Sequence, residues 1–175
     1  FIMSVSLQAQ EHFADRYNVS YITMDDGLPH NFIDDIYKDT RGFLWISTAG
    51  GGLSRYDGYE FIHFNPNTPH SKLKSNFIHN VYEDRFHRLW IVSEGGTDII
   101  DLSTLQSVIP NDPKGLLPRF INHPTYIVIL DSQGCIWLQC DNALHRITFD
   151  AEGGIDTLST LDLPEQDEPD LILKD

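Results

Sequence analysis

The apolar residues of this chain fall in short runs that recur along the sequence. Three of these runs, "FLWIS", "RLWIV" and "CIWLQ", do not alternate with polar residues, and each contains one of the three tryptophans. A strand that is apolar on both sides is normally covered on both faces. No long helical periodicity separates the runs, so we expect other sheets, rather than helices, to provide the cover.

The sequence around each tryptophan repeats. Trp45, Trp90 and Trp137 are separated by 45 and 47 residues, and an aspartate stands six residues before each. The segments "NFIDDIYKD" and "NFIHNVYED" before the first two are near copies. Short strands that repeat every 40–50 residues or so, without helices between them, are the sequence signature of a β-propeller.

Each repeated aspartate opens a predicted turn between two strands. The aspartates are Asp39, Asp84 and Asp131, and aspartate favours the first position of a type I turn. Glycine takes the fourth position in two of the turns. His87 takes it in the middle repeat, a substitution that a type I turn tolerates.

We therefore predict an all-β fold: a partial β-propeller of about three four-stranded antiparallel blades plus the start of a fourth. The fourth blade is predicted because "LILKD" at the end of the chain matches "IVILD", 44 residues earlier. The predicted divisions are a signal-peptide remnant (1–10), a leader with a lone first strand at Val19–Met24 (11–26), blade 1 (27–71), blade 2 (72–119), blade 3 (120–161), and an acidic loop with the start of blade 4 (162–175).

The glycine run "AGGG" after Trp45 has two interpretations. A phosphate-binding loop would require a helix directly after it, whose N-terminus holds the anion. Here the strand-like segment "LSRYDGYEFIHF" follows instead, which favours a tight link between strands. Five residues after each tryptophan stand Gly50, Gly95 and Asn142, and we expect a positive φ at this position.

Charge and cysteine content narrow the possible functions. The chain has 12 Lys and Arg against 26 Asp and Glu, a net charge of −14, and no basic stripe, so we expect no nucleic-acid binding. Cys135 and Cys140 would lie roughly 16 Å apart on opposite faces of a strand, which favours two buried thiols over a disulfide. The histidines show no metal-ligand spacing, so we expect neither a metal nor a cofactor.

Candidate ligand contacts come from loops at one end of the propeller channel. The links after the tryptophan strands would project Thr48, Glu94 and Asp141, although each is also compatible with an ordinary loop residue. The links between repeats are the alternative set. Four acids, Asp25, Asp26, Asp34 and Asp35, invite comparison with a glycosidase, but acids adjacent on a strand point to opposite sides. We predict no catalytic residue.

Two motifs together resemble a known family. The segment "MDDGLPHNFIDDIYKDTRGFLWISTAGGGLSRYDGYEFIHF", followed by "LKSNFIHNVYEDRFHRLWI", is similar to the two-component-regulator propeller repeats found in extracytoplasmic sensors of bacterial hybrid two-component systems. The resemblance implies a periplasmic ectodomain of an inner-membrane histidine kinase, which senses oligosaccharides and controls polysaccharide-utilisation genes. The middle repeat departs from the pattern at His87 and in "SEGGTDIIDL".

Two other functions stay open at this point: a carbohydrate-active propeller enzyme, either a lyase or a glycosidase, and a non-catalytic scaffold for protein interactions. The expected partners are an oligosaccharide, bound by the full ectodomain, and the remaining blades or a second copy of the chain. We also expect the full-length protein to form a homodimer. Three blades are too few to close a ring, so their open faces should associate.

Overall fold

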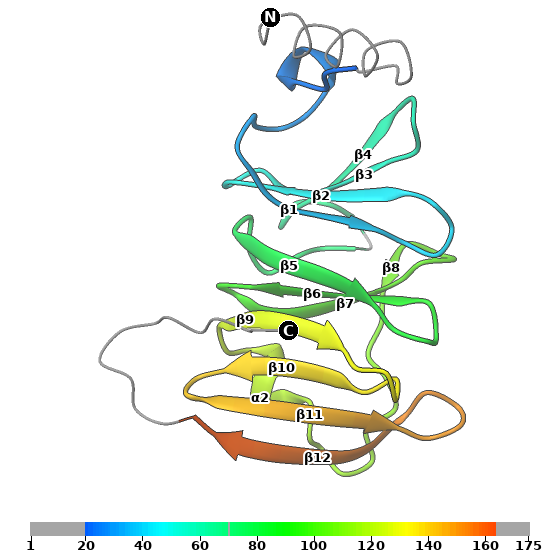
Figure 1. Cartoon of the computed structure of the whole chain (residues 1–175), viewed down its shortest axis with the longest axis vertical. Helices are drawn as coiled ribbons and strands as arrows, with labels where there is room; N and C mark the ends of the chain where they lie inside the picture. Colours follow the sequence, from blue (N-terminus) through cyan, green and yellow to red (C-terminus); the bar gives the residue numbers. More distant parts are fainter. Residues whose placement is uncertain (1–19, 70, 164–175) are drawn as a thin grey trace, which may run out of the picture.

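The computed structural model describes residues 20–69 and 71–163 as three four-stranded antiparallel sheets, stacked one on the next (Figure 1). The stack confirms the prediction of an all-β partial β-propeller with three blades. The predicted signal-peptide remnant lies outside the described residues, as does nearly all of the predicted start of a fourth blade. The strands are β1 (Ile33–Lys38), β2 (Leu44–Thr48), β3 (Gly52–Tyr56) and β4 (Phe61–Phe64) in blade 1; β5 (Ile78–Glu83), β6 (Arg88–Ser93), β7 (Gly96–Asp101) and β8 (Gln106–Ser107) in blade 2; and β9 (Thr125–Leu130), β10 (Ile136–Cys140), β11 (Ala143–Phe149) and β12 (Ile155–Asp162) in blade 3.

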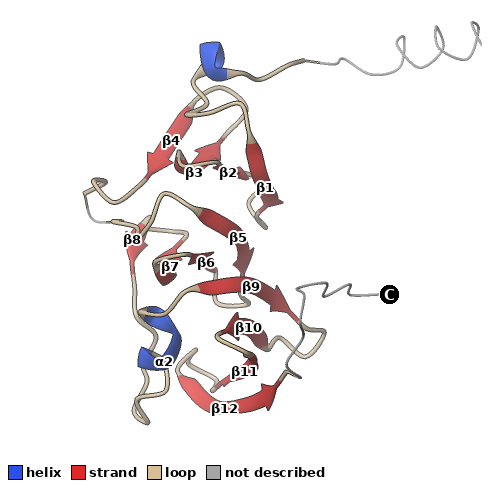
Figure 2. Cartoon of the chain, turned by 90° about the vertical axis from the view of Figure 1, so that its left-hand side faces the viewer, coloured by secondary structure: helices blue, strands red, loops and turns tan. Residues whose placement is uncertain are grey.

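Each blade is a simple meander in which consecutive strands pair. The first strands of the blades, β1, β5 and β9, lie next to one another along one side of the stack, and β4 and β8 lie on the other side (Figure 2). The strands of the three blades run from Ile33 to Phe64, from Ile78 to Ser107 and from Thr125 to Asp162. The helices in the described residues are short: the 3₁₀ turn η1 (Met24–Asp26) and α2 (Pro118–Ile121), which lies between β8 and β9.

The core lies between the blades rather than within them. Trp45, Leu53 and Phe64 of blade 1 pack against Ile91 and other apolar residues of blade 2 in one cluster. A second cluster joins the opposite face of blade 2 to blade 3. Its members include Trp90 from β6 and Phe149 from β11, whose ring centroids are 5.9 Å apart. Strand β6 is therefore buried on both faces, as its unbroken apolar run predicts.

A repeated hydrogen bond joins each tryptophan to the aspartate six residues before it. The indole Nε1 donates to Asp39 at 2.9 Å, to Asp84 at 2.8 Å and to Asp131 at 2.9 Å. The other oxygen of each carboxylate accepts two backbone N–H groups of the turn. The aspartate therefore holds both the turn and the tryptophan, whereas turn chemistry alone predicted only the first role.

These three aspartate–tryptophan contacts, here called clamps, differ in how deeply they are buried. Asp84 and its ion-pair partner Arg88 are buried, with 2.7 Å between Oδ2 and Nε. Asp131 is more accessible, and the Trp137 indole, followed by backbone N–H groups and Arg146, lowers its pKa to about 2. The clamp at Asp131 therefore stays ionised throughout the neutral and mildly acidic range.

A second repeated contact links the first strands of neighbouring blades. The Oδ2 atom of Asp35 in β1 accepts the backbone N–H of Val81 in β5 at 3.2 Å. At the equivalent position of the next repeat, the side-chain amide of Asn80 accepts from the N–H of Val128 at 3.1 Å and donates to its carbonyl oxygen at 2.9 Å. The side chain at this position therefore hydrogen-bonds to the backbone of the first strand of the next blade.

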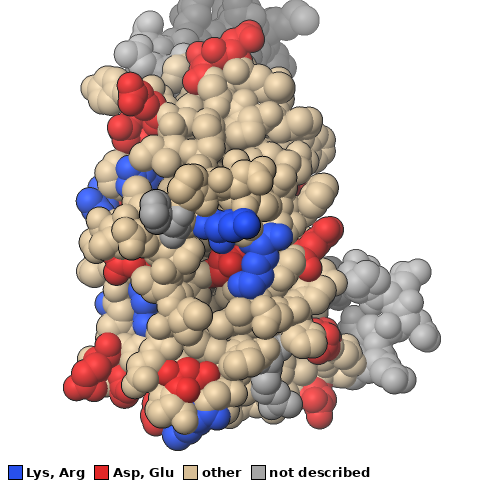
Figure 3. Space-filling view, turned by 180° about the vertical axis from the view of Figure 1, so that it is seen from behind, with Lys and Arg blue, Asp and Glu red and all other residues tan. Residues whose placement is uncertain are grey.

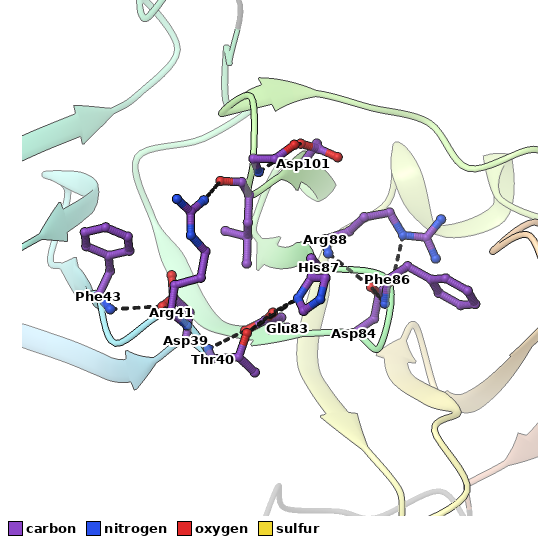
Figure 4. A network of polar contacts seen from close by, with 12 residues as sticks. Asp39, Thr40, Arg41, Phe43, Glu83, Asp84, Phe86, His87, Arg88 and Asp101 are labelled. Atoms are coloured by element: carbon purple, nitrogen blue, oxygen red, sulfur yellow. Dashed lines mark hydrogen bonds and ion pairs between the residues drawn. The ribbon is translucent and has the colours of Figure 1, made fainter.

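At the end where β1 and β5 finish, a buried carboxylate joins blades 1 and 2 (Figure 4). Glu83 accepts the backbone N–H and the hydroxyl of Thr40, both at 2.7 Å, and lies 2.8 Å from Nδ1 of His87. Burial raises the pKa of Glu83, but the hydrogen bonds from Thr40 and His87 together bring it below the usual value. The carboxylate is therefore held ionised within the interface.

Two local predictions are corrected by the structure. The residues from Ser20 to Thr23 are not a strand, and Met24–Asp26 form η1. A strand needs a hydrogen-bonding partner, and the described part of the chain places none beside these residues. Instead, the side chain of Thr23 accepts from the Asp25 N–H and Asp26 accepts from the Thr23 N–H, which closes a capping box.

The positive φ expected five residues after each tryptophan occurs only in the first repeat. Gly50 has a φ of 69°, but in the other two repeats the positive φ falls on Gly96 and Asp141 instead of Gly95 and Asn142. The link between β2 and β3 has one residue more than its counterparts. The two shorter links also differ from each other, with the positive φ six residues after Trp90 and four residues after Trp137, so the three turns do not share one conformation. The cysteines, by contrast, are both buried and form no disulfide with one another, as predicted.

Candidate functional site

Two sets of links meet at the end of the stack where the first strands begin. The links that follow the tryptophan strands contact the links that join one blade to the next. The N–H of Gly52 donates to the Asn76 carbonyl at 3.0 Å, and the N–H of Glu94 donates to the Phe77 carbonyl at 3.3 Å. The two sets, which the sequence left as alternatives, therefore form one rim.

A cavity of about 370 Å³ opens in this rim between blades 1 and 2. Its volume lies in the range of about 300–1,000 Å³ that is typical of small-molecule sites. Blade 1 contributes Asp34 from β1 and Ala49 from the link after β2. The lining residues from blade 2 are Phe77, Ile78, His79 and Glu94.

The cavity wall combines carboxylates with aromatic surface. Asp34 and Glu94 are exposed, and neither forms an ion pair within the part of the chain that the structure describes. Phe77 is 53% exposed. The ring of His79 lies 5.2 Å from that of Tyr126 in blade 3, so aromatic groups continue along the rim beyond the cavity. A wall of this kind can accept hydrogen bonds and offer a flat apolar surface at the same time.

Histidine 79 also carries an unsatisfied polar atom. Its Nε2 is buried and has no hydrogen-bond partner among the described residues. A buried polar atom without a partner costs free energy, and such exceptions in a native fold call for an explanation. Here the atom belongs to one of the residues that line the cavity.

The three predicted ligand contacts have different positions. Glu94 lines the cavity, and Asp141 is exposed on the equivalent link of blade 3. Thr48 is fully buried, so its side chain does not project from the link as the prediction required. It is the last residue of β2, and the residue of blade 1 that stands where Glu94 stands in blade 2 is Ala49.

Sequence reasoning missed the contribution of the first strands. Asp34 was considered only as one of several clustered acids, and Phe77 and His79 were not candidates. One signal was present: the near copies "NFIDDIYKD" and "NFIHNVYED" differ in the second and third positions after "NF", at Asp34 and Asp35 against His79 and Asn80. The repeat thus keeps its packing residues but changes side chains that face the rim and the neighbouring blade.

No group of three or more His, Cys, Asp or Glu side chains in residues 20–69 and 71–163 is arranged to hold a metal ion. Within the same ranges, no helix has the length and apolar character needed to span a membrane. Acidic and basic groups are scattered in small clusters over the face in Figure 3, with no continuous basic stripe.

A family comparison matches both repeats that flank the cavity. Residues 27–50 and 72–95 match the family described as "Two component regulator propeller". These two segments are therefore similar to two-component regulator propeller repeats. The matched segments end in the links that hold Ala49 and Glu94, so the cavity lies between two recognised repeats. A comparison with curated protein sequences gives no match.

Several solved structures are similar to the propeller repeats of this chain. The extracellular domain of the hybrid two-component system BT3049 from B. thetaiotaomicron matches with a TM-score of 0.63 and 21% identity, over 82% of this chain and 20% of that one. The ectodomain of BT4673 from the same organism matches with a TM-score of 0.56 and 24% identity, over 75% and 19%. A streptogramin B lyase matches with a TM-score of 0.52 and 16% identity, over 80% and 43%. These likenesses show the fold, and the chain spans about a fifth of the length of the two ectodomains.

Proposed function

We propose that this chain is part of the periplasmic sensor propeller of a hybrid two-component system. The complete ectodomain would bind an oligosaccharide and signal through its histidine kinase to genes for polysaccharide use. The observation that carries the proposal is the pair of two-component regulator propeller repeats, at 27–50 and 72–95. The similarity to ectodomains of such systems supports the same location outside the cytoplasm.

The rim between the blades supports binding rather than catalysis by this part of the protein. Its cavity offers acceptor groups and an exposed ring, which are the features that hold a sugar by its hydroxyls and its apolar face. The repeated aspartates are engaged in clamping turns and tryptophans, so they are not free to serve as an acid–base pair. We propose no catalytic role for the segment.

Calorimetric titration of the complete ectodomain against a panel of oligosaccharides tests the proposal. We expect one class of sugar to bind saturably, with one site per ectodomain, and to change kinase output in the intact protein. A scaffold for protein interactions would bind no sugar in the panel. A lyase or glycosidase would convert the bound sugar, so chromatography of the mixture after titration would reveal new products.

A further inference from the structure

We infer that the cavity between blades 1 and 2 is a saccharide subsite selective for sugars that carry hydroxyl or amine donors and no acidic group. This inference rests on the proposed sensing function and adds the place of contact and the class of ligand. The site would consist of Asp34, Glu94 and Phe77, with His79 in the wall between them.

The charge of the lining carries the selectivity. Two of the six lining residues are carboxylates, and neither lysine nor arginine is among them. Lys74 lies against Gly95, the residue after the lining residue Glu94. Its ammonium group is already bound to Asp98 at 2.8 Å and to the Thr97 carbonyl at 2.7 Å. A carboxylate or sulfate group on a ligand would therefore meet two like charges and no lysine or arginine in the cavity lining.

The same carboxylates suit a donor-rich ligand. A carboxylate accepts hydrogen bonds but cannot donate them, so sugar hydroxyls and ammonium groups are its natural partners. Such bonds are stronger than bonds between neutral groups because one partner is ionised. Asp34 and Glu94 come from different blades, so a ligand that binds both would bridge the interface between blades 1 and 2.

The apolar side of the cavity supplies the second part of the recognition. The ring of Phe77 is half exposed and lies against the link at Gly50, where an added Cβ would come within 3.6 Å of the ring. Ala49 and Ile78 complete this side. An exposed ring beside acceptor groups matches a pyranose, which has an apolar face and a polar edge.

The test compares three disaccharides on the complete ectodomain by calorimetry. The ligands are cellobiose, its diamino counterpart made of two glucosamine units, and a disaccharide that contains glucuronic acid. We expect the two non-acidic sugars to bind and the glucuronate to bind at least about tenfold more weakly. The affinity of the diamino sugar should also fall as salt is added, because the attraction is partly between charges.

Matched variants locate the site. Glu94→Gln should weaken the diamino sugar about tenfold, since one charge-assisted hydrogen bond is lost, and it should improve binding of the glucuronate. A merely structural role for Glu94 would not produce this reversal. Glu60→Gln makes the same chemical change on the exposed turn between β3 and β4, at the other end of blade 1, and should leave all three affinities unchanged. Phe77→Ala should weaken both non-acidic sugars, whereas Tyr59→Ala, on a ring that is 91% exposed on that distant turn, should not.

The outcomes separate the two proposals. If sugars bind but the variants at Glu94 and Phe77 do not alter their affinities, or if the glucuronate binds best, the ectodomain is a sugar sensor and this subsite is refuted. If no sugar in the wider panel binds, the sensing function itself fails. Both proposals are supported if the non-acidic sugars bind and Phe77→Ala weakens that binding. Glu94→Gln should then also weaken the diamino sugar and improve binding of the glucuronate.

Discussion

At the scale of single residues, one position in the first strands of blades 1 and 2 hydrogen-bonds to the backbone of the next blade. The side chain there is a carboxylate in β1 and an amide in β5. Asn80 both donates to and accepts from the backbone of β9, while Asp35 accepts one bond from β5. Burial raises the pKa of Asp35, with the hydrogen bonds from Val81 and Ile36 opposing the effect only in part. The ionised carboxylate of Asp35 is therefore less favourable between two blades than the neutral amide of Asn80.

We predict that Asp35→Asn stabilises the chain at neutral pH, by about 1 kcal/mol, the typical net value of one hydrogen bond. The pKa of Asp35 is higher in the folded state than in the unfolded state, so folding favours its protonated form. The wild type therefore loses stability as the pH rises through the folded pKa, and the asparagine variant does not. Urea unfolding followed by tryptophan fluorescence should show a gap between the two that is largest at neutral pH and closes in acid. A gap that is independent of pH would contradict the argument.

At the scale of elements, the turn between the first and second strands of each blade depends on a left-handed fourth residue. Gly42 and Gly134 have φ values of 94° and 77°, and His87 adopts 59° in the middle blade. The left-handed region costs a non-glycine residue roughly 1–2 kcal/mol. His87 is retained in a strained conformation in which its ring meets the buried Glu83.

Two substitutions separate the strain at His87 from its hydrogen bond. His87→Ala loses the bond to Glu83 and keeps the strain, whereas His87→Gly loses both. We therefore predict that the glycine variant is more stable than the alanine variant by about 1 kcal/mol, the reverse of the order in a helix. Urea unfolding measures the difference. Equal stabilities, or a more stable alanine variant, would mean that the turn relaxes its φ when the ring is removed.

The sequence predicted those strands and turns that are determined by residues within a single repeat. The unbroken apolar runs around Trp45 and Trp90 predicted strands covered on both faces, and the spacing of the tryptophans predicted the number of sheets. The position of the left-handed residue after each tryptophan was wrong in two repeats, because the three links do not share one turn conformation. The cavity was missed because its wall joins residues about 45 positions apart, such as Asp34 and His79, and only the stacking of blades brings them together.

At the scale of the whole molecule, the three tryptophans show that burial comes from neighbouring blades. Trp45 and Trp90 are fully buried, each between two blades, whereas Trp137 is only partly buried. Trp137 lies on the face of blade 3 that points away from blade 2, together with Ile129 and Leu161. The last two are 39% and 59% exposed. At the opposite end of the stack, Ile36 of β1 is 59% exposed. An apolar sheet face of this kind is a surface for association.

We therefore predict that the 175-residue chain, when studied alone, associates through these faces instead of remaining a monomer. The driving force is burial of the apolar side chains around Trp137, which should add burial to the tryptophan and shift its fluorescence to shorter wavelength. Sedimentation at increasing protein concentration should show a rising mass, and Leu161→Lys should shift the chain towards the monomer because it places a charge on the open face. Ile109→Lys changes an equally apolar residue, 76% exposed in the segment after β8, and should have no such effect. A stable monomer for the unmodified chain, or equal effects of the two lysine variants, would show that the outer face of blade 3 does not drive association.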